Sequence, residues 1–109
     1  MGKFVKGDVV VIPFPFSNLS DSKRRPALVI APLSGDDVIL CSITSSSVDP
    51  HAVPLSVSDL VGGSLDHASY IRPTHLFTAD SKMILRRVGN LPHVKTTQVI
   101  EKIIAVLKS

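Results

Sequence analysis

The stretch Lys23-Arg24-Arg25-Pro26-Ala27-Leu28-Val29-Ile30 sets three consecutive cations directly against an apolar run. We expect the apolar half to be a buried strand. The cationic half must stay in water or meet an anion, because an unpaired buried charge is costly. Pro26 fixes its own φ and biases Arg25 towards an extended conformation. The stretch therefore predicts a rigid strand end that presents a positioned guanidinium. The alternative is a solvated loop with ordinary surface charge.

The composition indicates one folded domain, residues 1–109, with 44% hydrophobic and 19% charged residues. The net charge of +3 is compatible with a polyanionic partner without requiring one. The single cysteine, Cys41, excludes an intramolecular disulfide and a multi-cysteine zinc site. Its apolar surroundings predict a buried structural thiol. A reducing, cytoplasmic setting is consistent with a single free cysteine. No apolar run approaches the ~18 residues of a membrane span, so we expect no membrane partner.

Short apolar runs separated by turn signals predict a series of strands. We expect the run at residues 9–12 to end at Pro13 and Pro15, which cannot donate to a ladder. The turn Ser34-Gly35-Asp36-Asp37 predicts a hairpin between strands at residues 26–31 and 38–43. Further strands are expected at residues 52–57, 68–71, 76–78 and 83–85, the last with Val88.

A helical pattern is strong at the C-terminus, from about residue 92 to residue 108. Pro92 suits a first helical turn. The apolar stripe on one face of this helix consists of Val99, Ile100, Ile103, Ile104 and Leu107. Five to seven short strands with one terminal helix predict a mainly β fold, a small barrel with a C-terminal α-helix.

Polar side chains gather at the expected strand ends. Arg25 begins the second strand, Thr44 and Ser45 end the third, and Arg72 and Thr74 end the fifth. In an antiparallel hairpin the start of one strand and the end of the next lie at the same edge, which places Arg25 near Thr44. Two arginines and several hydroxyls on one groove predict an oxyanion or phosphate site. Alternatively, Ser45 belongs to an ordinary polar loop, and Arg72 is an ordinary surface charge at the end of a strand.

Two common kinds of site are missing from the sequence. There is no phosphate-binding glycine loop and no paired-carboxylate motif. The histidines are not at metal-ligand spacing with one another. We therefore expect neither a metal nor a cofactor.

The pattern Gly7-Asp8-Val9-Val10-Val11, a polar loop and then Arg25-Pro26-Ala27-Leu28-Val29-Ile30 resembles the MazF/PemK family of toxins from type II toxin–antitoxin systems. Three later stretches match more weakly, and together they extend the resemblance over nearly the whole chain: Ile43-Thr44-Ser45, Tyr70-Ile71-Arg72-Pro73 and Val88-Gly89-Asn90-Leu91. The resemblance implies an SH3-like barrel that forms a homodimer, and a cognate antitoxin that covers the RNA groove.

The resemblance also implies a metal-independent endoribonuclease, an mRNA interferase that cuts single-stranded RNA at short sequences. In this chemistry a ribose 2′-hydroxyl attacks the adjacent phosphorus and leaves a 2′,3′-cyclic phosphate. Arg25 would stabilise the transition state, Thr44 would donate a hydrogen bond to the same phosphate, and Arg72 would be a second electrostatic group. We expect Lys23, Arg24, Arg25 and Arg72 on one face. The RNA contacts would come from Lys23, Arg24, Ser45, Thr74 and His75.

The chain departs from the family pattern in two places. The first loop, residues 17–23, lacks the Glu or His that some members carry, and Thr74 stands where one branch has an Asp. The general base is therefore left open between Asp21, His51 and His75.

Two alternative functions share this type of fold. One is a gyrase poison of the CcdB type, against which the lack of Trp counts. The other is a non-catalytic SH3-like module that binds nucleic acid or protein, which leaves the hydroxyls at the strand ends unexplained.

Overall fold

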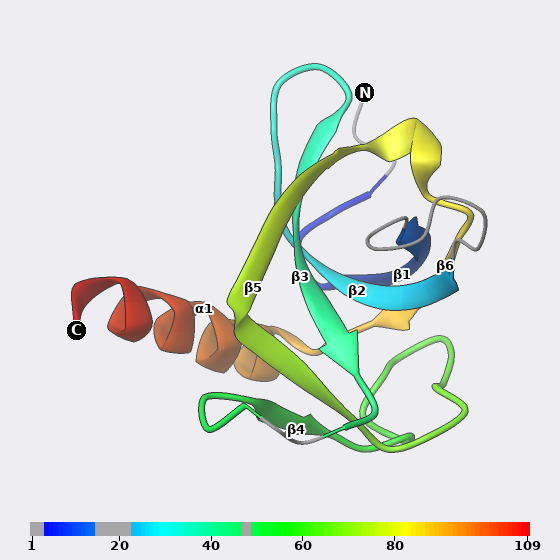
Figure 1. Cartoon of the computed structure of the whole chain (residues 1–109). Coiled ribbons are helices and arrows are strands. Elements are labelled where there is room, and N and C mark those ends of the chain that lie inside the picture. The colour runs from blue at the N-terminus through cyan, green and yellow to red at the C-terminus, as the bar shows by residue number, and fades with distance from the viewer. Residues whose placement is uncertain (1–3, 15–22, 47–48) are drawn as a thin grey trace.

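The computed structural model describes residues 4–14, 23–46 and 49–109 of the chain (Figure 1). Within these residues the chain forms six strands, a short 3₁₀ helix and a C-terminal α-helix. The elements in order are β1 (Asp8–Phe14), β2 (Lys23–Pro32), β3 (Asp37–Thr44), β4 (Val53–Leu55), β5 (Ser69–Asp80), η1 (Ser81–Met83), β6 (Arg86–Asn90) and α1 (His93–Lys108). No helix in the described part of the chain is long and apolar enough to cross a membrane.

The six strands form one sheet in the order β4-β5-β3-β2-β1-β6, and every neighbouring pair is antiparallel. The sheet curls strongly into a half-barrel, with α1 beside one end of it (Figure 1). A backbone bridge between Val61 and Asn90 ties the β4–β5 connection to β6. The prediction of a mainly β barrel with a C-terminal helix is therefore confirmed.

Successive side chains of a strand point to opposite faces of the sheet. Both faces of the central strands are buried, because each face packs into its own core. One core contains Val9, Leu28 and Cys41 together with Val99 and Ile103 of α1. The core on the other face is built from Val10, Ile12, Ala27, Val29, Val38 and Leu40, with Phe77 and Ala79 packed against it. The continuous apolar runs of β1 and β2 thus reflect burial on both sides.

The expected boundaries of the first two strands are wrong. β1 continues through Pro13, which lies opposite Arg24 in the register. A proline removes one donor, but its extended φ is compatible with a strand. The pairing of Phe14 with Lys23 then starts β2 at the first of the three cations. The cations therefore lie on a paired strand and not in a loop.

The expected end of the fifth strand at Ile71 is also wrong, because β5 is a single strand of 12 residues. Ile71 pairs with Ile43, and Leu76 pairs with Cys41. Five residue steps on β5 thus match two on β3, and β5 carries three extra residues. We call residues 72–75 the β5 bulge. The bulge accommodates Pro73 within a strand and coincides with a sharp bend of β5 (Figure 1).

Two further expectations need correction. β4 covers residues 53–55 and is shorter than expected. The last strand, expected at residues 83–85 with Val88, starts later, at Arg86, and forms β6. Residues 81–83 form η1 instead, where the Asp80 carboxylate accepts a hydrogen bond from the Lys82 amide. The expected C-terminal helix is confirmed, and it begins at His93 with Pro92 as its N-cap.

The apolar stripe of α1 is partly exposed. Val99 and Ile103 are buried, but Ile104 and Leu107 are 46% and 74% exposed. The buried face instead includes Thr96, whose hydroxyl donates to the carbonyl of Leu91.

The β4–β5 connection approaches β6 closely at Gly63. A Cβ atom on Gly63 would lie 1.6 Å from the carbonyl oxygen of Val88. The neighbouring Gly62 has open space around its Cα and a φ of +78°. A side chain at position 63 would therefore push the connection away from β6.

Gly63→Ala is expected to lower the free energy of unfolding by about 3 kcal/mol, because the backbone of β6 cannot yield as a flexible side chain can. Gly62→Ala is the matched control, and its positive φ alone should cost about 1 kcal/mol. Urea unfolding of both variants measures the difference. Equal losses of stability would show that the close approach is unimportant.

Candidate active site

A cavity of about 540 Å³ lies where β2 begins and β3 ends. Arg24 and Arg25 line it from β2, and Thr44 and Ser45 line it from β3. As the hairpin geometry predicts, Arg25 and Thr44 share this site. The remaining lining residues are Val11, Pro26, Ile43, Ser64, Leu65, Asp66, His67, Ser69, Leu85, Arg86 and Val88.

The lining of the cavity is strongly cationic. It contains three arginines, Arg24, Arg25 and Arg86, against the single carboxylate of Asp66. Arg24 and Arg25 are exposed, and neither pairs with a carboxylate among the residues that the structure describes. Pairing of Arg25 with Ile12 fixes its backbone. The site therefore presents solvated guanidinium groups on a rigid strand, a suitable arrangement for an anion.

Thr44 carries a hydroxyl that is oriented by the chain that follows β3. Its oxygen accepts a hydrogen bond from the amide of Ser46 at 3.2 Å. The hydroxyl proton remains able to donate to a bound group. Apolar side chains next to it, among them Ile43 and Leu65, belong to or pack against the first core.

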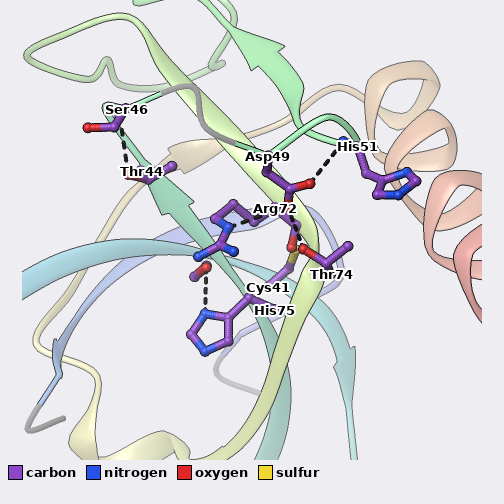
Figure 2. A network of polar contacts seen from close by, with 9 residues as sticks. Cys41, Thr44, Ser46, Asp49, His51, Arg72, Thr74 and His75 are labelled. Carbon is purple, nitrogen blue, oxygen red and sulfur yellow. Dashed lines mark hydrogen bonds and ion pairs between the residues drawn. The ribbon is translucent and has the colours of Figure 1, made fainter. Parts of the chain in front are cut away.

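A second polar group is the bulge network, in which Arg72, Thr74 and His75 of the β5 bulge contact Asp49 and Ser42 (Figure 2). Nε of Arg72 lies 3.4 Å from a carboxylate oxygen of Asp49. The hydroxyl of Thr74 donates to the same oxygen, and the amide of His51 donates to the other at 2.9 Å. The Asp49 side chain is only 6% exposed, whereas that of Arg72 is 36% exposed.

The bulge network shifts the pKa values of its members. The hydrogen bond from Thr74, then that from the His51 amide, holds the pKa of Asp49 below its usual range. Burial, and then the charge of Arg72, lowers the pKa of His75, whose Nδ1 lies 2.8 Å from the Ser42 hydroxyl. Burial raises the pKa of Cys41 to about 12. Its thiol donates to the carbonyl oxygen of Arg72, so Cys41 is a buried structural thiol, as predicted.

The cavity and the bulge network are linked through β3. Thr44 pairs with Tyr70, and Arg72 lies two residues further on the same face of β5. Arg25 reaches this face as well, because it lies two residues from Ala27, which pairs with Ser42. However, the predicted site residues Arg72, Thr74 and His75 do not line the cavity.

Three predicted residues are left to consider: His51, Asp21 and Lys23. His51 is exposed and binds Asp49 through its backbone amide, outside the lining of the cavity. Asp21 and the side chain of Lys23 lie outside the described residues. Within those residues, no group of three or more His, Cys, Asp or Glu side chains could hold a metal ion.

Sequence reasoning missed Arg86, Asp66 and His67 as members of the cavity. Arg86 was visible as a cation next to a strand. Asp66 and His67 lie in the connection between β4 and β5, whose course the sequence does not reveal. The pair Gly62-Gly63 could have indicated that this connection packs closely on another strand, since a glycine often marks a close backbone approach.

The comparisons with known proteins agree with this architecture. The family model of the PemK-like, MazF-like toxins of type II toxin–antitoxin systems matches residues 5–107. The chain belongs to this toxin family. The comparison with curated proteins gives no match.

Solved structures of this toxin type share the fold. A MazE–MazF structure from Deinococcus radiodurans superposes with a TM-score of 0.76 at 22% identity, covering 96% of each chain. An endoribonuclease from Mycobacterial species in complex with its cognate antitoxin gives 0.75 at 14% identity, covering 99% of this chain and 96% of the other. The Mycobacterium tuberculosis toxin MazF-mt6 gives 0.73 at 17% identity, covering 93% of this chain and 96% of that toxin.

Thr74→Val should raise the pKa of Asp49 towards its ordinary value, because it removes the hydrogen bond that contributes most to lowering that pKa. A lowered pKa stabilises the fold above the pKa of the unfolded chain, and this contribution is lost as the pH falls through the folded pKa. The variant should therefore be less stable than wild type at neutral pH, with the gap closing in acid.

Carboxyl ¹³C NMR titration measures the pKa of Asp49, and urea unfolding across pH measures the stability. Thr78→Val is the control, since Thr78 is exposed on the same strand and pairs with Ile39. An unchanged Asp49 titration in Thr74→Val would show that this hydrogen bond is not what lowers the pKa.

Proposed function

We propose that this protein is a metal-independent endoribonuclease that cuts single-stranded RNA at short sequences, and that it is the toxin of a toxin–antitoxin pair. The observation that carries the proposal is that Arg25 and Thr44 lie on the same face of the sheet, where β2 begins and β3 ends, and that both belong to the residues that line the cavity. An exposed guanidinium and a hydroxyl that can donate are thereby brought to one edge of the sheet. A structural neighbour that is an endoribonuclease bound to its antitoxin supports the proposal.

The proposed reaction begins with attack of the ribose 2′-hydroxyl on the adjacent phosphorus. The bond from phosphorus to the 5′-oxygen breaks, which leaves a 2′,3′-cyclic phosphate and a free 5′-hydroxyl. Negative charge grows on the non-bridging oxygens in the transition state. Arg25 stabilises this charge, and Thr44 donates a hydrogen bond to the same phosphate.

Arg72 acts as a second electrostatic group from the bulge network. An arginine is a poor proton donor at neutral pH, because its delocalised guanidinium holds its proton strongly. Its Nε is held by Asp49, so its orientation is fixed while its charge is partly compensated. We therefore assign it a smaller effect on the rate than Arg25.

The RNA chain is held by cations and hydroxyls on both sides of Arg25. Arg24, Ser45 and the newly found Arg86 share the cavity with it. Lys23 precedes them on β2, and Thr74 and His75 extend the polar face along β5. These contacts to the backbone would give affinity that weakens as salt is raised.

We further propose that the working form is a homodimer, and that a cognate antitoxin covers the RNA site. Structural neighbours from Deinococcus radiodurans are MazE–MazF structures, which supports an antitoxin partner.

Wild-type protein should cut long single-stranded RNA in EDTA at a few short sequences, with products that end in a 2′,3′-cyclic phosphate. RNA with deoxyribose at the cut site should stay intact. Arg25→Ala should slow cleavage by on the order of 10²-fold or more, as loss of an oxyanion donor does. Thr44→Ala should slow it less, because it removes a neutral donor.

Arg25→Lys should recover part of the rate, because it keeps the charge and loses the planar fork. Lys108→Ala, at the exposed end of α1, is the control that removes a charge remote from the cavity. Binding should survive the Arg25 and Thr44 variants better than cleavage does. If wild type binds RNA but leaves it intact at high enzyme excess, the protein is a binding module and not a nuclease.

A further inference from the structure

The proposed reaction needs a group that removes the proton of the 2′-hydroxyl. Neither Arg25 nor Thr44 can accept this proton at neutral pH. Among the candidates from the sequence, His51 and His75 do not line the cavity. Nδ1 of His75 is moreover engaged with the Ser42 hydroxyl. The acceptor must therefore be sought among the other residues around Arg25.

Two of the described side chains that line the cavity can accept a proton, Asp66 and His67. A general base works best when its pKa is near the working pH. Imidazole groups in general meet this condition, whereas carboxylates are much weaker bases. The chemistry of the lining therefore favours His67.

The backbone that carries His67 is fastened to the barrel. Its carbonyl oxygen accepts a hydrogen bond from the hydroxyl of Ser69 at 3.0 Å, and Ser69 is buried at the start of β5. On its other side, the connection is held at β6 by the Val61–Asn90 bridge and by the close approach of Gly63. His67 is exposed and is one of the residues that line the cavity.

We propose that His67 is the general base of this site, an inference that rests on the proposed nuclease function. A ring nitrogen of neutral His67 takes the 2′-hydroxyl proton as the bond from the 2′-oxygen to phosphorus forms. The bond from phosphorus to the 5′-oxygen breaks, and the departing oxygen takes a proton from water. The imidazolium then releases its proton to solvent.

Four charged groups share the cavity with the ring. Asp66 lies on the same connection, Arg24 and Arg25 lie on β2, and Arg86 lies on β6. Of these, Asp66 is the competing proton acceptor. Asp66→Asn is therefore the matched control for a change at His67.

The test is single-turnover cleavage of RNA as a function of pH, in EDTA, for wild type, His67→Gln and Asp66→Asn. The wild-type rate should rise with pH and level off as an imidazole loses its proton. His67→Gln should lose about 10²-fold in rate and most of this rise, the usual contribution of a general base. Its affinity for RNA with deoxyribose at the cut site should be unchanged. Added imidazole should restore part of the rate of His67→Ala.

The possible outcomes separate this inference from the proposed function. If wild type cleaves and His67→Gln keeps both its rate and its pH profile, His67 is not the base. If the rise with pH disappears in Asp66→Asn and persists in His67→Gln, Asp66 is the base instead. A wild-type protein that cleaves no RNA at any pH would overturn the nuclease function, and this inference with it.

Discussion

The pairing of β5 with β3 is the constraint on which the rest of the structure depends. β5 must follow β3 along its length while carrying three residues more than β3 offers. The surplus forms the β5 bulge, where the strand bends and the sheet curls (Figure 1). Before the bend, Ile71 packs in the first core, and after it Phe77 packs against the second. One strand thereby serves both cores.

The bend also explains why the polar residues form two groups. The start of β5 and the connection before it bring Ser69 and His67 to the cavity at the end of β3, which Arg25 and Thr44 also line. The polar bulge residues instead find partners within the protein: Arg72 and Thr74 contact Asp49, and His75 contacts Ser42. The cavity thus keeps solvated arginines that lack a protein partner among the described residues. Cations of this kind cost the fold little in water and gain most from an anion that enters.

The sequence was sufficient to predict the features that local residue patterns determine. The apolar runs located β1, β2, β3 and α1, and the hairpin turn was enough to place Arg25 beside Thr44. It failed where tertiary pairing overrides a local signal. Pro73 suggested a break, but the bulge absorbs it within β5. His67 and Arg86 were missed because their place depends on how a connection between strands packs onto β6, which no periodicity reports.

The most direct measurement is a crystal structure of the protein with a short single-stranded RNA that carries deoxyribose at the cut site and therefore stays intact. The account predicts that the phosphate at this site lies in the cavity. Its non-bridging oxygens should be within hydrogen-bond distance of the Arg25 guanidinium and the Thr44 hydroxyl, with the His67 ring facing the 2′ position. An RNA backbone bound elsewhere on the protein, with the cavity left empty, would contradict it.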